Sequence, residues 1–207
     1  MDLGWHSGGI KNDRSFLMVN WNLAKEDPYY RARRLEEEAR RTGSAEAWQA
    51  FATLKAEKGS YVLAGHGFFS GALACEQAGD IDRAFDLYAQ AFQKARSSRS
   101  KELAVMVAYR HALLAERAER WEVCIDIYGA LGAFAEELGN HFIAADAYEH
   151  AAEIKVKAGQ SIADYVKPIE QWEKNAVYWR KQGHEDDACW SERHIALYRA
   201  LFGAQTK

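Results

Sequence analysis

Residues 79–91 are GDIDRAFDLYAQA, and this stretch decides the fold. Gly79 and Asp80 form a break between two segments, because glycine favours the end of a helix and aspartate favours the start of the next. After the break, apolar residues recur at intervals of three and four: Ala84, Leu87, Tyr88, Ala91 and Ala95. This spacing predicts an amphipathic α-helix with one face packed against the rest of the protein.

Similar breaks recur about every twenty residues along the chain. They stand at 79–80, 98–100, 119–120, 139–140, 160–161 and 183–184. A twenty-residue interval leaves room for about 16 helical residues and a short turn, so consecutive helices must pack antiparallel. Upstream, Asp27 and Pro28 predict the start of a helix that runs to about Arg41, and Ser44 predicts the start of another. Because no segment alternates between polar and apolar residues, we expect about eight or nine helices and no strand.

One spacing of small and aromatic residues appears three times. The three sets are Ala84, Tyr88 and Ala91; Cys124, Tyr128 and Leu131; and Ala144, Tyr148 and Ala151. A small residue lets a neighbouring helix approach closely, and the tyrosine fills the wedge beside it. We therefore expect Ala84, Tyr88, Ala144 and Tyr148 to be buried between helices.

This repeat resembles the tetratricopeptide repeat (TPR) superfamily. One hairpin matches at Phe68, Gly71, Ala72, Cys75, Ala84, Tyr88 and Ala91, and a second at Ala108, Ala112, Ala115, Cys124, Tyr128 and Leu131. Residues 144–154 resemble the SNAP-like branch, which has longer helices. The hairpin period is forty residues rather than about 34, and Phe68 and Ala108 replace the family's tryptophan. The resemblance spans residues 61–203 and implies an all-α, right-handed superhelical solenoid of antiparallel hairpins.

The chain divides into two parts. Residues 1–25 lack a helical period and are predicted to form an irregular N-terminal arm. Residues 26–207 are predicted to form a single TPR-like domain, with the clearest repeats at 61–158 and capping helices at 161–203. Pro168 lies inside an apolar stripe at helical spacing, so we expect a kink or break near Lys167.

Composition excludes several classes of protein. The 207 residues carry 27 basic and 30 acidic side chains, a net charge of −3, which argues against a nucleic-acid partner. No apolar stretch approaches the ~20 residues of a membrane helix, so membrane insertion is not expected. Cys75, Cys124 and Cys189 lie among apolar helical residues and are predicted to be buried thiols in a reducing compartment. We therefore expect a cytoplasmic protein.

Motifs for chemistry are missing from the sequence. His184 and His194 are ten residues apart, not the four that place two metal ligands on one helix face. The segment Gly65-His66-Gly67 lacks the residues that complete a phosphate-binding loop. The sequence therefore predicts no enzyme activity, no catalytic residue, no cofactor and no metal.

The TPR resemblance implies a binding groove lined by the first helix of each hairpin. The predicted groove residues are His66, Phe69, Leu73, Gln77, Tyr109, Arg110, Leu113 and Arg117. A competing interpretation is that Phe69 and Leu73 are covered by the preceding helix or by the N-terminal arm. A second candidate is the basic turn, formed by Lys94, Arg96, Arg99 and Lys101, which would bind an acidic partner or a phosphate. Its alternative is a solvated turn in which positive charge favours a helix C-terminus.

These observations predict a non-enzymatic scaffold or adaptor that binds a partner peptide or helix in its concave groove. Two alternatives remain open. One is self-association as a homo-oligomeric structural module, through an apolar end of the array or through the arm. The other is a regulatory domain that binds a small ligand within the superhelix.

Overall fold

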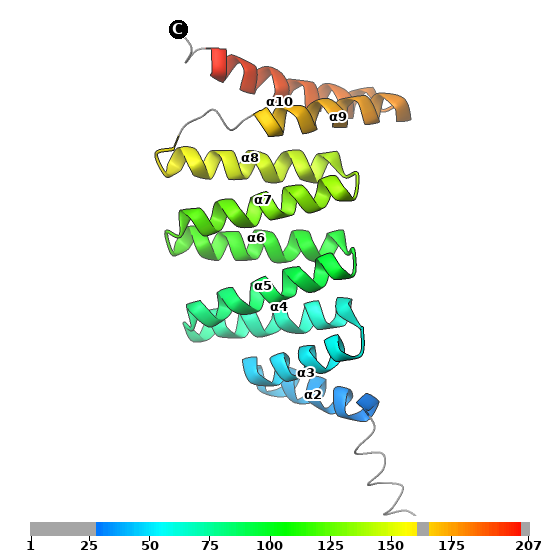
Figure 1. The fold of residues 1–207 in the computed structure, drawn as a ribbon, viewed down its shortest axis with the longest axis vertical. Helices are drawn as coiled ribbons and strands as arrows, with labels where there is room; N and C mark the ends of the chain where they lie inside the picture. Colours follow the sequence, from blue (N-terminus) through cyan, green and yellow to red (C-terminus); the bar gives the residue numbers. More distant parts are fainter. Residues whose placement is uncertain (1–27, 161–165, 204–207) are drawn as a thin grey trace, which may run out of the picture.

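The computed structural model describes residues 28–160 and 166–203, and all regular structure in these ranges is helical. The helices are α2 (Pro28–Thr42), α3 (Ala45–Glu57), α4 (Tyr61–Ala78), α5 (Ile81–Ser97), α6 (Lys101–Arg117), α7 (Trp121–Glu137), α8 (His141–Lys157), α9 (Val166–Gln182) and α10 (Glu185–Gly203). They stack in chain order along the long axis of the molecule (Figure 1). The prediction of an all-α protein is confirmed, and the described residues contain nine sequential helices.

The twenty-residue interval is visible in the backbone of the turns. A residue with positive φ ends a helix at positions 59, 79, 99, 119, 139 and 159. Glycine fills this position four times, whereas Arg99 and Glu119 adopt it with φ of 53° and 54°. Side chains then cap the next helix by accepting a backbone N–H three residues on, as at Ser44, Asp80, Ser100 and Asn140. Each turn therefore combines a helix stop with a helix start.

Helices pack mainly against their neighbours in the sequence, as expected for a helical repeat array. Ala84, Tyr88 and Ala144 are fully buried and Tyr148 is 7% exposed, which confirms the predicted packing positions. A Cβ at Gly132 of α7 would lie 2.6 Å from the Tyr148 ring of α8. Only glycine at this position lets the two helices approach so closely.

Cross-helix contacts repeat with a period of forty residues. Glu76 pairs with Arg117 and Glu116 with Lys157, at 3.5 and 2.7 Å. Asp82 accepts from Arg120, and Glu122 accepts from Gln160, both at 2.6 Å. In each case the second pair lies forty residues after the first, so the repeating unit is a helical hairpin.

A helix begins at Val166, in agreement with the predicted break near Lys167, and no kink occurs at Pro168. Pro168 lies in the first turn of α9 and is buried, and α9 continues without interruption to Gln182. Proline fits there because the N–H groups of the first turn have no partner within the helix. The predicted N-terminal arm, residues 1–25, lies outside the described residues. Each helix that the structure describes is too short or too polar to cross a membrane.

The cysteine prediction is wrong at one position. Cys75 and Cys124 are buried, but Cys189 is exposed. On α10 the inward face is formed by Ala188, Ser191 and Ile195, so the residue after Ala188 points away from α8 and α9. Burial raises the pKa of the Cys75 thiol, and it raises that of Cys124 to about 11.

Thiol labelling should distinguish the three cysteines. With a thiol reagent at neutral pH, we expect one rapidly labelled group per native chain and three per unfolded chain. Cys189→Ser should abolish the rapid labelling, because Cys75 and Cys124 are both buried and held as thiols. Rapid labelling that persists in Cys189→Ser would show that a second cysteine is accessible in the native protein.

Candidate interaction surface

The predicted groove residues lie on α4 and α6, and the structure places them in different environments. His66 and Gln77 are exposed, and Leu113 is exposed to 37%. Phe69 and Leu73 are partly buried against the core, and the Phe69 ring lies 5.8 Å from that of Tyr88. Phe69 and Leu73 are therefore partly covered, and the ring beside Phe69 comes from α5, the helix that follows α4, rather than from the preceding helix or the N-terminal arm.

Arg110 and Arg117 converge on one carboxylate, that of Glu76 on α4. Glu76 accepts hydrogen bonds from Nε and Nη2 of Arg110, at 3.1 and 2.8 Å, and lies 3.5 Å from Arg117 Nη1. The Tyr88 hydroxyl donates to the same carboxylate at 2.9 Å. We call these four residues the Glu76 cluster. The side chain of Glu76 is only 11% exposed, so its charge is held in place and compensated by the two arginines.

Tyr88 shows the electrostatic effect of this cluster. Burial raises the pKa of the Tyr88 phenol well above its usual range, and the neighbouring Glu76 carboxylate raises it further. The hydroxyl therefore remains a hydrogen-bond donor throughout the ordinary pH range. Glu76, which the sequence did not suggest as a site residue, fixes the two predicted arginines.

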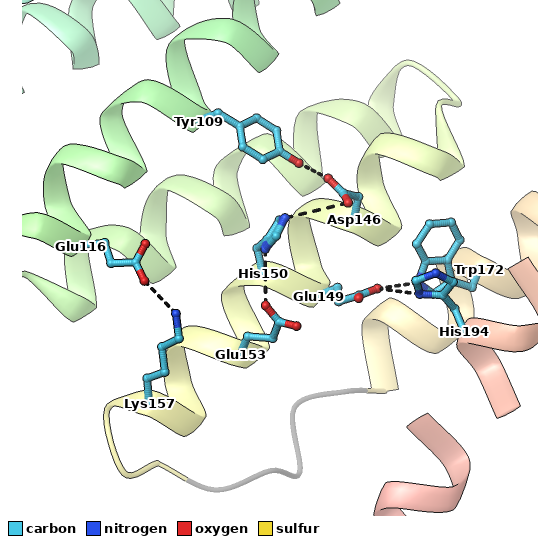
Figure 2. A network of polar contacts seen from close by, with 9 residues as sticks. All are labelled: Tyr109, Glu116, Asp146, Glu149, His150, Glu153, Lys157, Trp172 and His194. Carbon is cyan, nitrogen blue, oxygen red and sulfur yellow. Dashed lines mark hydrogen bonds and ion pairs between the residues drawn. The ribbon is translucent and has the colours of Figure 1, made fainter. Parts of the chain in front are cut away.

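Tyr109 connects α6 to α8, as Figure 2 shows. Its hydroxyl donates a hydrogen bond to Asp146, and its ring lies 5.5 Å from Tyr128 and 5.7 Å from His150. His150 stacks on Tyr128 at 5.1 Å. Burial is the main reason that the pKa of Asp146 is raised. Tyr109 is therefore a partly buried connection between helices as well as a candidate contact residue.

Two further carboxylates of α8 contact histidine side chains, as Figure 2 shows. Glu153 lies 3.5 Å from Nδ1 of His150, and Glu149 lies 3.4 Å from Nδ1 of His194 on α10. Glu149 also accepts a hydrogen bond of 2.9 Å from the indole N–H of Trp172 on α9. The Glu149 carboxylate is thus oriented by side chains from α9 and α10.

These contacts define one continuous surface, which we call the α4–α6–α8 face. Bonds from Glu76 to Arg110 join α4 to α6, and the bond from Tyr109 to Asp146 joins α6 to α8. In the order of the chain, α5 stands between the first two of these helices and α7 between the second two. Met106, at helical spacing from Tyr109 and Leu113, adds an exposed apolar side chain to this face.

Three of the four side chains of the basic turn contact an aromatic ring or a carboxylate of the same chain. The Lys94 ammonium lies 5.6 Å from the centre of the Tyr61 ring, and Arg96 pairs with Glu137 at 3.2 Å. Lys101 lies 3.8 Å from Glu102, and Arg99 holds the positive φ of the turn. These partners reduce the charge that the turn offers to an acidic ligand.

Among the described residues, no group of three or more His, Cys, Asp or Glu side chains is placed to hold a metal ion. Compared with models of known protein families, the chain matches none, and no curated protein is found to be similar to it.

Proposed function

We propose that the protein is a non-enzymatic interaction scaffold of the TPR type, a right-handed superhelical solenoid that binds a segment of a partner protein on its α4–α6–α8 face. The forty-residue recurrence of cross-helix contacts supports the solenoid. The partner would be a peptide or a helix, because successive helices offer contacts along a line rather than around a pocket.

The observation that carries this proposal is the fixed arrangement of side chains across alternate helices. Arg110 is held by Glu76, and Tyr109 is held by Asp146. Side chains that are already ordered lose little conformational entropy when a partner binds. On α6, the exposed Met106 and Leu113 lie about one turn before and one turn after these two residues, and α4 carries the partly buried Leu73. Aromatic residues, methionine and arginine are enriched in protein interfaces, so this composition suits a binding surface.

Leu113→Asp tests the proposal with little risk to the fold, because Leu113 is already exposed to 37%. The matched control is Val123→Asp on α7, where the side chain is 36% exposed. Proteins captured from a lysate of the source cells would be quantified by mass spectrometry, and the leading candidate would be purified for titration. We expect Leu113→Asp to weaken its binding by at least about tenfold and Val123→Asp to leave it unchanged.

Equal binding by the two variants would contradict the proposal, provided that both melt at the wild-type temperature.

Phe69→Ala and Tyr109→Ala are less informative first variants. Both rings are partly buried and contact other aromatic rings, so their removal would also lower stability.

A further inference from the structure

The last two described helices carry similar eight-residue motifs. Residues 173–180 on α9 are EKNAVYWR, and residues 192–199 on α10 are ERHIALYR. Both begin with Glu and a basic residue, continue with two apolar residues at the fourth and fifth positions, and end in Arg. Because the two helices follow one another in an antiparallel hairpin, the Glu end of each motif lies beside the Arg end of the other.

This arrangement is confirmed by ion pairs at both ends of the motifs. Arg199 pairs with Glu173, and Arg180 pairs with Glu192. Between the two pairs lies a hollow of about 370 Å³, lined by residues of α9 and α10 alone. Its apolar lining comes from Ala176, Val177, Ile195 and Ala196, and Val177 is half exposed. The surface therefore has an apolar centre between four charged corners.

The signs of the four corners alternate. Glu173 and Glu192 occupy one diagonal, and Arg180 and Arg199 occupy the other. Consider a second copy placed face to face by a two-fold axis lying in the interface. Whether that axis runs along the helices or across them, each Glu faces an Arg of the second copy. A partner with a single sign of charge would instead meet two like charges. The surface is thus complementary to itself.

We propose that the α9–α10 face is the interface of a two-fold symmetric homodimer, in which Val177 lies at the centre and the four charged residues form the rim. This proposal is independent of partner binding on the α4–α6–α8 face. An apolar centre within a charged rim is the usual arrangement of a protein–protein interface, and a two-fold axis places the same patch of both subunits in contact.

Val177→Asp is the first test. We expect light scattering with size-exclusion chromatography to give twice the mass of one chain for the wild type at about 100 µM, where a Kd of about 10 µM leaves the dimer predominant. Val177→Asp should give the mass of one chain. Val62→Asp, at a 42% exposed position on α4, should remain dimeric. A monomeric wild type, or a dimeric Val177→Asp, would overturn the proposal.

A pair of charge variants tests the complementarity itself. One variant carries Glu173→Arg and Glu192→Arg, so that all four corners are positive. The other carries Arg180→Glu and Arg199→Glu, so that all four are negative. We expect each variant to be monomeric alone and a 1:1 mixture to form a heterodimer, with circular dichroism confirming that both are folded. A mixture that stays monomeric would show that these corners do not face each other between chains.

Discussion

Glu76→Ala should lower the free energy of unfolding by about 2–3 kcal/mol. The substitution leaves the hydroxyl of Tyr88, a fully buried residue, without its acceptor, and an unpaired buried donor costs about 1–3 kcal/mol. The remaining loss comes from Arg110, whose bidentate contact with Glu76 disappears. Because the Arg110 side chain is 37% exposed, solvent compensates much of that second loss.

Glu116→Ala is the matched control, because Glu116 occupies the same place in the next repeat. Its side chain is 37% exposed and pairs with Lys157, which is itself exposed to 55%. A pair of this kind contributes less than about 1 kcal/mol. Denaturant titrations of both variants would measure the difference. Equal losses at the two positions would show that the burial of Glu76 has no energetic consequence.

A double-mutant cycle would assign the loss within the Glu76 cluster. Tyr88→Phe removes the donor, so Glu76→Ala should cost less in that background than in the wild type. The expected coupling is about 1 kcal/mol, the contribution of a partly buried hydrogen bond to a carboxylate. Additive effects would mean that Tyr88 and Glu76 contribute to stability independently.

The sequence predicted the helices because their signals are local. Several turns combine a stop residue with a capping side chain at the next position, as at Gly79 and Asp80. The burial of Ala84 and Tyr88 also followed from helical spacing alone. Signals of this kind depend on residues within one or two turns of helix, so the sequence contains them directly.

The partners of the predicted site residues were beyond such reasoning. Arg110 lies 34 residues from Glu76, and Tyr109 lies 37 residues from Asp146. Whether the members of each pair meet in space depends on how three successive helices are rotated against one another. The spacing of apolar residues does not specify that rotation. The same limit explains Cys189, because an apolar neighbour on a terminal helix does not determine which side faces inward.

One signal in the sequence could have revealed part of the Glu76 cluster. A glutamate precedes each repeat tyrosine by twelve residues, and the tyrosine donates to it at Tyr88–Glu76 and Tyr148–Glu136. At the intermediate repeat, Tyr128 stacks on His150 and Glu116 pairs with Lys157 instead. The recurrence therefore indicates a tyrosine–glutamate contact, although it does not determine which repeats form it.

His111 should make the protein sensitive to acid. Its side chain lies in the core beside the rings of Phe85 and Tyr88, at 5.1 and 5.4 Å, and its Nε2 atom is buried without a hydrogen-bond partner. Burial lowers the pKa of His111 from 6.5 to about 4. The unfolded chain therefore takes up this proton before the folded protein does. The contribution of His111 to the free energy of unfolding is therefore complete above pH 6.5. It decreases by about 3 kcal/mol as the pH falls to 4.

His111→Leu removes both the titrating ring and the unpaired nitrogen while keeping an apolar side chain of similar size. We expect its free energy of unfolding at pH 7 to equal or exceed that of the wild type, since no buried donor or acceptor is left without a partner. Between pH 6.5 and 4 its stability should fall by about 3 kcal/mol less than that of the wild type. Urea titrations at several pH values would measure both quantities.

The comparison between variants isolates His111 from the other groups that titrate over this range. Asp146 acts in the opposite direction, because its pKa is raised in the folded protein and its protonation there favours folding as the pH falls. That contribution is common to the wild type and His111→Leu, so it cancels in their difference. His184→Gln, which removes an exposed histidine, should keep the wild-type pH dependence. If His111→Leu keeps it as well, the core does not hold His111 in its neutral form.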